Sequence, residues 1–300
     1  MQKVIFKLFL LFTGIVQFAH AQQYDSLEKV KTGAAAIYYS TGHQQRATKI
    51  ATQLEKAMLY YQELLDYKLV VTLLILSPAD WKKYTSMGAV YGMPHFSAKN
   101  KTLYVAAEDN AFWKSFLPPL DRLPAELSQQ IQSVYKNAEG ELSMEAFFDL
   151  LAIHELGHAF QTQANLTMQR TWMGELFVNI LLHTYIAEKE PALLPALTLF
   201  PKMVIAGGSQ EFKYTKLQDI EERYNDIARD NPKNYGWYQC RWHAAAGKIY
   251  DAAGAQVGKK IWLAFSNQKE KLTDKELITF LELHAHKSLA ELIEKWDAGY

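Results

Sequence analysis

Two histidines and one glutamate interrupt an apolar stretch that carries no other charge. Residues 150–160 read L-L-A-I-H-E-L-G-H-A-F, with His154 and His158 four positions apart and Glu155 between them. In an α-helix, residues four positions apart lie about 40° from each other around the axis and one turn along it, so both imidazoles can reach one point. Burying a carboxylate and two imidazoles without partners costs several kcal/mol. The stretch therefore predicts a buried helix whose three polar side chains meet a common partner.

A divalent metal ion is the partner that this spacing fits. Zn²⁺ binds imidazole nitrogen at about 2.0–2.1 Å, and H-E-x-x-H on a helix presents two such donors on one face. His154 and His158 are therefore predicted zinc ligands, and one Zn²⁺ ion is the predicted cofactor. Glu155 follows the first ligand directly. It is predicted to contact a water molecule at the metal without binding the metal, which is the position of a general base.

A catalytic zinc site needs a third protein ligand and an open fourth position. The metzincin pattern would require glycine and histidine at positions 161 and 164, but glutamine and alanine stand there. Glu175 is the predicted third ligand, because it lies 17 positions after His158 as the lone carboxylate of the stretch T-W-M-G-E-L-F-V-N. Glu188 and Glu190 remain alternatives. Asn179, one turn after Glu175, is either a residue that orients the carboxylate or a histidine, or an ordinary helix-surface asparagine.

Composition excludes several classes of protein. The 300 residues carry 32 Lys+Arg and 32 Asp+Glu, so the chain lacks the positive charge that a phosphate backbone attracts, and nucleic acid is not an expected partner. A hydrophobic fraction of 49% with 21% charged residues excludes low-complexity disorder. Cys240 is the single cysteine. An intramolecular disulfide and an all-cysteine metal cluster are therefore excluded, and Cys240 is expected to pack as a small apolar group.

Residues 1–21 are typical of a secretory signal peptide. Lys3 and Lys7 precede an apolar stretch that reaches Phe18, and Ala19-His20-Ala21 matches a cleavage site. The stretch is too short to cross a bilayer, although an uncleaved N-terminal anchor is the alternative. No later apolar stretch reaches about 18 residues. We therefore expect a secreted or periplasmic protein with no membrane span after signal cleavage.

The order of the predicted elements indicates an α+β fold. Helical periodicity over 47–65 is followed by two predicted strands, 68–77 and 102–106. From residue 144 onward the patterns are helical, over 144–163, 171–188, 237–254, 274–286 and 288–296, with prolines 191, 195 and 201 interrupting an apolar stretch. The region 118–140, which contains several prolines, reads as an inserted excursion that could act as a lid. We expect one two-lobed domain over 22–300, with a mixed-sheet lobe that includes the active-site helix (22–165) and a mostly helical lobe (166–300).

The chain resembles the gluzincin zinc metallopeptidases at two segments, His154-Glu155-Leu156-Gly157-His158 and Trp172-Met173-Gly174-Glu175-Leu176-Phe177. The second segment is similar to the W-x-x-E-x-F of aminopeptidase N-like enzymes. The resemblance implies a zincin-like fold, a peptide or protein substrate, and peptide-bond hydrolysis with Glu155 as the base. It implies an edge strand within 88–107 that pairs with an extended substrate. It also implies a tyrosine that stabilises the oxyanion, for which Tyr238 is the first candidate and Tyr235 the alternative.

Two departures from that family bear on the substrate. The G-x-M-E-N segment with which those exopeptidases hold a free amine is missing from the sequence, and so is the length needed for their multidomain body. Both departures favour an endopeptidase over an aminopeptidase. Two other interpretations stay open: a degenerate relative that binds peptide or metal without turnover, and a zinc amidase that acts on cell-wall peptides.

The remaining polar candidates have simpler interpretations. His183 is expected to be a hydrogen-bonded core residue, and His284 and His286 are expected on different faces of a surface helix. His243, within two turns of Tyr238, is either a core residue or an aid to transition-state binding. Arg241 is expected in a structural ion pair, or in contact with a substrate carboxylate.

Overall fold

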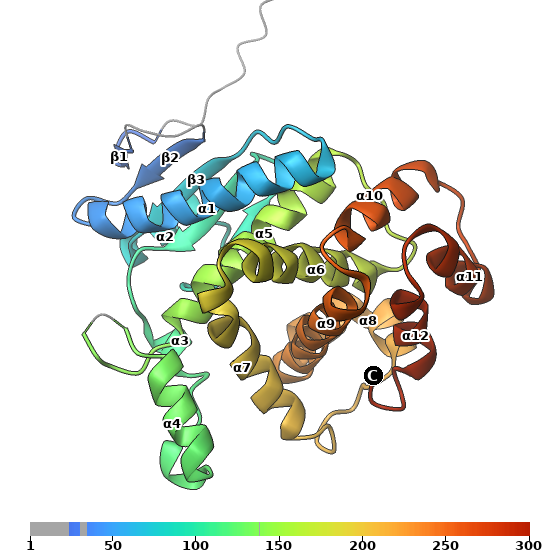
Figure 1. Cartoon of the computed structure of the whole chain (residues 1–300). Coiled ribbons are helices and arrows are strands. Elements are labelled where there is room, and N and C mark those ends of the chain that lie inside the picture. The colour runs from blue at the N-terminus through green and yellow to red at the C-terminus, as the bar shows by residue number, and fades with distance from the viewer. Residues whose placement is uncertain (1–23, 31–34, 138) are drawn as a thin grey trace, which may run out of the picture.

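A five-stranded sheet forms the N-terminal part of the protein. The computed structural model describes residues 24–30, 35–137 and 139–300 (Figure 1), so the predicted signal peptide at 1–21 lies outside the described residues. The strands follow the order β1-β2-β3-β5-β4 across the sheet: β1 (Glu28–Lys29), β2 (Ala36–Tyr39), β3 (Thr72–Leu76), β4 (His95–Ser97) and β5 (Thr102–Ala106). The central strands β2, β3 and β5 are parallel, whereas β1 and β4 pair antiparallel at the two edges.

Both strands predicted from the sequence are present. The second keeps its predicted bounds, and the first begins at Thr72 rather than at residue 68. The reason lies in the preceding helix, α1 (Gln44–Leu65), which ends at Asp66 in a left-handed conformation with φ of 51°. The chain needs residues 67–71 to return from this end to the sheet. The mixed sheet, followed by helices, confirms the α+β fold class.

Helix α1 and helix α5 (Glu145–Gln163) cover the same face of the sheet. Leu54 of α1 and Leu156 of α5 line one small cavity together with three strand residues, Ile37, Leu73 and Leu103. Helix α5 also packs against β4 and β5. The sheet therefore fixes the position of α5, and α5 carries the H-E-x-x-H segment.

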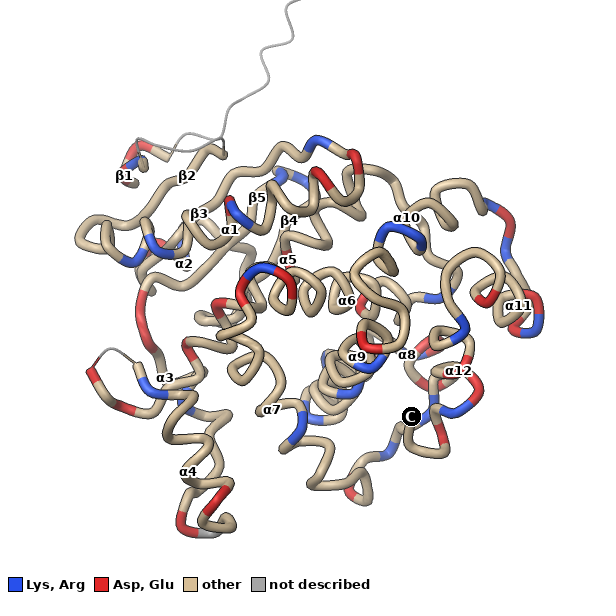
Figure 2. The backbone as a smooth tube through the Cα atoms, viewed as in Figure 1, with Lys and Arg blue, Asp and Glu red and all other residues tan. Residues whose placement is uncertain are grey.

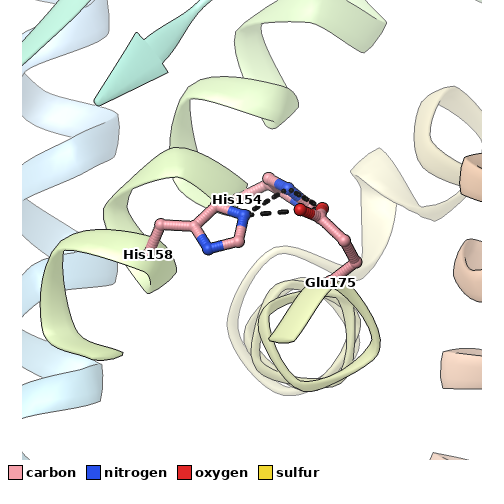
Figure 3. A group of neighbouring side chains, drawn as sticks. All are labelled: His154, His158 and Glu175. Atoms are coloured by element: carbon pink, nitrogen blue, oxygen red, sulfur yellow. Dashed lines mark hydrogen bonds and ion pairs between the residues drawn. The ribbon is translucent and has the colours of Figure 1, made fainter. Parts of the chain in front are cut away.

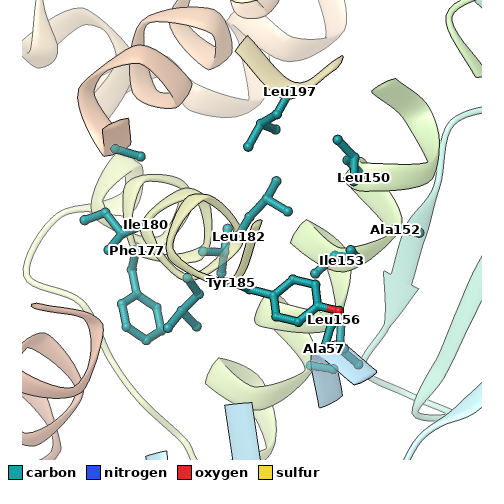
Figure 4. Close-up of a cluster of buried hydrophobic side chains, with 14 of the residues drawn as sticks. Ala57, Leu150, Ala152, Ile153, Leu156, Phe177, Ile180, Leu182, Tyr185 and Leu197 are labelled. Carbon is teal, nitrogen blue, oxygen red and sulfur yellow. The ribbon is translucent and has the colours of Figure 1, made fainter. Parts of the chain in front are cut away.

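Helix α6 (Thr171–Lys189) packs against α5 at very close range. A Cβ atom added to Gly157 of α5 would lie 2.9 Å from Cβ of Val178 in α6, so only glycine permits this approach. Figure 4 shows the surrounding core, to which α5 contributes Leu150 and Ile153, and α6 contributes Ile180. Nearly every residue of α6 from Trp172 to Ile186 is buried. A helix surrounded by protein on all sides shows little amphipathic pattern, and the sequence of α6 shows little.

The C-terminal part is helical, as predicted. Its elements are η2 (Pro191–Leu193), α7 (Leu194–Ala206), α8 (Leu217–Asp230), α9 (Pro232–Ala253), α10 (Val257–Asn267), α11 (Asp274–His284) and α12 (Lys287–Lys295). The long α9 packs along α6 and α7 (Figure 1). Acidic and basic residues are scattered over the outer helices, whereas the tube of α6 is tan over most of its length (Figure 2). Within the described ranges, no helix has both the length and the apolar content needed to cross a membrane.

The apolar stretch that prolines were expected to interrupt forms one helix, α7. Its chain stays helical through Pro201, because a side chain from elsewhere compensates the irregular turn. The buried hydroxyl of Tyr135 donates to the carbonyl of Ala196 at 3.0 Å and accepts from the amide of Phe200 at 3.0 Å. These two backbone groups would bond each other in a regular helix. The hydroxyl is therefore inserted into the helical ladder one residue before the proline.

Tyr135 also anchors the excursion predicted around 118–140. This region contains η1 (Leu120–Arg122) and α4 (Ala125–Val134), follows the short α3 (Ala111–Lys114), and projects from the rest of the molecule (Figure 1). Another short helix, α2 (Pro78–Tyr84), follows β3 and is capped by Ser77. The contact of α4 with α7 ties the excursion to the helical part. That the excursion acts as a lid stays a prediction.

Candidate metal centre

Helices α5 and α6 bring three predicted ligands together. Nε2 of His154 lies 3.2 Å from Oε2 of Glu175, and Nε2 of His158 lies 3.5 Å from the same oxygen. The two Nε2 atoms are 3.2 Å apart. Figure 3 shows the two imidazoles of α5 and the carboxylate of α6 pointing toward one another. Three donors from two helices thus face one point at the close α5–α6 contact.

These separations match those expected of ligands around one zinc ion. Bond lengths of about 2.0–2.2 Å and tetrahedral angles place neighbouring donor atoms about 3.3–3.5 Å apart. The three observed distances, 3.2, 3.2 and 3.5 Å, require only small adjustments to admit an ion. Two imidazoles and one carboxylate are also a donor set that zinc uses in catalytic sites. The residues present therefore fit a zinc ion with three protein ligands.

Asn179 selects the nitrogen that His154 presents to the cluster. Oδ1 of Asn179 lies 2.8 Å from Nδ1 of His154, and both side chains are buried. An amide oxygen is only an acceptor, so Nδ1 of His154 donates to it, and Nε2 is the nitrogen that faces the cluster. Asn179 thus orients a histidine, one of the two interpretations that the sequence leaves open.

The charges of the cluster are strongly coupled. Burial by itself would lower the pKa of His158, but the carboxylate of Glu175 outweighs burial and raises this pKa to about 9. Burial would likewise raise the pKa of Glu175, yet His158 and His154 hold it well below its usual range. Without a metal, a proton on His158 offsets the charge of Glu175. A metal ion would replace that proton, as zinc sites in general require.

Glu155 lies beside the cluster and contacts the edge of the sheet. Its Oε2 accepts a hydrogen bond of 2.9 Å from the backbone amide of Phe96 in β4. Among the described strands, β4 pairs with β5 alone and is an edge strand, which the region 88–107 was predicted to contain. The amide of Phe96 therefore points away from β5 and toward α5. The structure puts the predicted base and the predicted substrate-pairing strand in direct contact.

The structure corrects the choice of tyrosine. Tyr238 is fully buried away from the cluster, its hydroxyl donates to the carbonyl of Lys216 at 2.8 Å, and its ring stacks on Trp242 and Trp296. Tyr235, the alternative, is linked to the cluster through hydrogen bonds of 2.7 Å to Tyr224 and to Gln239. The two positions lie about 60° apart around α9, and Tyr235 is the one whose hydroxyl joins the hydrogen bonds that reach Glu175.

Two residues at the cluster were not predicted from the sequence. The hydroxyl of Tyr224 donates to Oε1 of Glu175 at 2.7 Å, and Nε2 of Gln239 donates to Oε2 of Glu175 at 2.9 Å. Gln239 follows Tyr235 by four positions, so the spacing was available, but the predicted helix started too late, at residue 237 rather than at Pro232. Tyr224 lies in α8, which was not predicted, although Leu217, Ile220, Tyr224 and Ile227 recur at helical spacing.

An open cleft of about 430 Å³ adjoins the cluster. His158, Glu175 and Tyr224 form one part of its lining. The rest of the lining is mainly hydroxyl and amide groups, contributed by Gln161, Thr162, Asn165, Leu166, Thr167, Thr171 and Gly174. Solvent and a ligand can thus reach the cluster from the side of the α5–α6 connection.

The alternative ligands and the remaining polar candidates lie elsewhere or play other roles. Glu188 accepts a hydrogen bond from Tyr250, and Glu190 pairs with Lys56 at 2.9 Å, so neither joins the cluster. His243 is buried with its ring 6.1 Å from that of His154, and burial lowers its pKa to about 3.

Five further candidates lie outside the cluster and have structural explanations. Arg241 was expected in an ion pair or at a substrate carboxylate. Instead, its guanidinium lies over the ring of Trp296 and donates to the carbonyl of that residue. His183 and Cys240 are buried, as expected. His284 and His286 do not share a helix, because α11 ends at His284 and His286 caps α12.

A scan against protein-family models and a search of curated protein sequences both returned no match to this chain.

Proposed function

We propose that the protein is a zinc-dependent peptidase that cleaves extended peptide segments internally. The observation that carries this proposal is the convergence of His154, His158 and Glu175, whose donor atoms lie 3.2–3.5 Å apart. Glu155 beside them supplies a base, and the adjacent edge strand β4 offers backbone groups to a peptide. The resemblance to gluzincins at both helices points to the same chemistry.

Glu155 and Tyr235 would have separate roles in the reaction. When bound, Zn²⁺ supplies Lewis acidity, which polarises a carbonyl group and lowers the pKa of water from 15.7 toward about 7. Glu155 removes a proton from the attacking water and then delivers that proton to the leaving amine. Tyr235 is the tyrosine that we assign to the developing oxyanion, and its O–H must turn away from Tyr224 to reach it.

The setting of the enzyme follows from the N-terminal sequence. Residues 1–21 have the pattern of a signal peptide, so we propose that the peptidase acts outside the cytoplasm, in the periplasm or after secretion. Its substrates there would be peptides or unfolded segments of proteins, because an edge strand pairs with extended chain only.

Metal content and cleavage of a denatured protein mixture test the proposal together. The purified protein should contain about one zinc per chain and should cleave the mixture. Glu155→Gln should keep the zinc and lose at least about 10²-fold in turnover, since general-base catalysis contributes about 10²–10⁴-fold. His158→Ala should lose zinc and activity, whereas Glu188→Gln, the matched control outside the cluster, should keep both.

Each contrary result has its own meaning. Full activity in Glu155→Gln refutes the assigned base. Zinc without protein cleavage, but with cleavage of cell-wall peptide fragments, replaces the peptidase with a zinc amidase. Zinc with neither activity leaves a binding protein, and a wild-type chain that binds no zinc refutes the metal centre itself.

A further inference from the structure

Both oxygens of Glu175 are held by side chains from the helices that follow α6. Oε1 accepts from the hydroxyl of Tyr224 in α8, and Oε2 accepts from the amide nitrogen of Gln239 in α9. Tyr235 lies between these donors, 2.7 Å from the hydroxyl of Tyr224 and 2.7 Å from the nitrogen of Gln239. The carboxylate is therefore part of a closed ring of hydrogen bonds.

The direction of each hydrogen bond in this ring is determined. Tyr224 has one hydroxyl proton, and it goes to the carboxylate, which is an acceptor only. Tyr224 must then accept from Tyr235 at the 2.7 Å contact. Tyr235 in turn accepts one N–H of Gln239, whose other N–H goes to Glu175.

Helix α8 is shaped to deliver Tyr224 to this place. Its backbone leaves the helical conformation at Arg223, where φ is −129°, and Tyr224 follows immediately. Two residues before this kink, the carboxylate of Glu221 accepts from the backbone amide of Thr171, the first residue of α6. Thr171 and Glu175 are one turn apart, so α8 forms hydrogen bonds with both ends of the first turn of α6. A helix that only covered α6 would not need these two hydrogen bonds.

We infer that Tyr224 is a positioning residue that makes Glu175 a one-oxygen ligand. The two histidine nitrogens both face Oε2, at 3.2 and 3.5 Å, whereas Oε1 is engaged by Tyr224. With Oε1 occupied, Glu175 fills one coordination position, and a position stays open for water or substrate. This inference rests on the proposed metal centre and assigns its geometry to a residue in a helix outside both motif segments.

Zinc affinity of Tyr224→Phe tests the inference. Competition with a chromophoric chelator should show zinc binding about 10–100-fold weaker than in the wild type, the loss typical when a ligand loses its hydrogen-bond partner. Tyr238→Phe is the matched control: it removes a buried tyrosine hydroxyl that contacts only backbone, and it should leave zinc affinity unchanged. Gln239→Leu removes the donor to Oε2 and should also weaken zinc binding.

A spectroscopic measurement separates positioning from general destabilisation. With Co²⁺ in place of zinc, the visible spectrum reports the coordination of the ion. Tyr224→Phe should change this spectrum, because Oε1 becomes free to bind the ion, while Tyr238→Phe should leave it unchanged. If Tyr224→Phe does not fold, Tyr224→Leu, which also removes the donor to Oε1, takes its place in both measurements.

The failure of this inference differs from the failure of the proposed function. A wild-type chain that binds zinc and cleaves peptides, with unchanged affinity and spectrum in Tyr224→Phe and Gln239→Leu, overturns the inference alone. A wild-type chain that binds no zinc overturns both.

Discussion

His243 is a buried ionisable residue in the core beside the candidate metal centre. Burial is the main cause that lowers its pKa to about 3, and the neighbouring imidazole of His154 adds to this effect. The unfolded chain has a histidine pKa of about 6.5. Below that pH the unfolded state therefore binds a proton that the folded state does not, so the free energy of unfolding falls as pH decreases from about 6.5 toward 3.

This pH dependence can be measured on the zinc-free protein. One pH unit corresponds to about 1.4 kcal/mol, so between pH 6.5 and pH 5 His243 should account for a loss of about 2 kcal/mol. In urea unfolding at pH 7 and pH 5, His243→Gln should lose about 2 kcal/mol less than the wild type. The exposed His284 offers a control, and His284→Gln should follow the wild type. Parallel curves for all three proteins would contradict the assignment.

Residue-scale prediction from the sequence succeeded where chemistry limits the choices. An uncharged stretch that contains H-E-x-x-H leaves few reasons for its polar residues, so the sequence alone is enough to group His154, His158 and Glu175. The choice between Tyr235 and Tyr238 had no such constraint. It depended on which face of α9 meets α6, and that is decided by tertiary packing rather than by the helical pattern of α9 itself.

At the scale of elements, the close approach of α5 and α6 sets the geometry of the centre. The contact depends on Gly157, whose place could not take a Cβ atom without moving Val178. Val178 is β-branched and buried, so it cannot rotate away easily. The ligands of α5 and α6 flank this contact, and any separation of the helices separates His154 and His158 from Glu175.

Gly157→Ala should therefore weaken both the fold and zinc binding. Overpacking a core typically costs about 1–3 kcal/mol, which exceeds the gain of about 0.5–1 kcal/mol from replacing a helical glycine. Gly236 in α9 is the matched control, because a Cβ there would meet nothing within 4 Å. Urea unfolding should show a loss for Gly157→Ala and a small gain for Gly236→Ala, and zinc affinity should fall only in the first. Equal stability of the two variants would refute the packing argument.

Two helices that were not predicted, α7 and α8, differ in what their sequences show. Helix α7 contains Pro201 and continues because Tyr135, from a distant segment, bonds the interrupted backbone. Its local pattern therefore argues against a regular helix, and a tertiary contact compensates. Helix α8 is kinked at Arg223, yet its apolar residues Leu217, Ile220 and Ile227 keep helical spacing. Helices α1, α5, α6 and α9, which contain neither proline after their first turn nor a kink, were predicted to within a few residues.

At the scale of the whole molecule, the candidate metal centre lies between two regions of the chain. Helix α5 is fixed by the sheet, whereas α6 is surrounded by α7, α8 and α9. An ion bound by His154, His158 and Glu175 would connect these regions, and it would bind the folded state only. Such binding raises the free energy of unfolding by about 2.7 kcal/mol when free ligand is at 100 times its Kd.

Thermal unfolding with and without a chelator measures this stabilisation. The wild-type Tm should rise when zinc is added and fall after chelation. Glu175→Gln should show no rise, while Glu190→Gln, which removes a carboxylate at the end of the same helix, should respond like the wild type. A rise of equal size in both variants would place the zinc somewhere other than at the three ligands.

Under the proposed function, the hydrogen bond between Phe96 and Glu155 would couple peptide binding to activation of the base. A peptide that extends the sheet at β4 must accept from the outward-facing amide of Phe96, and that amide already donates to the carboxylate of Glu155. One N–H group cannot fully serve both partners. An arriving peptide would thus displace the carboxylate from the amide, and Glu155 would become free to accept a proton only once the peptide is bound.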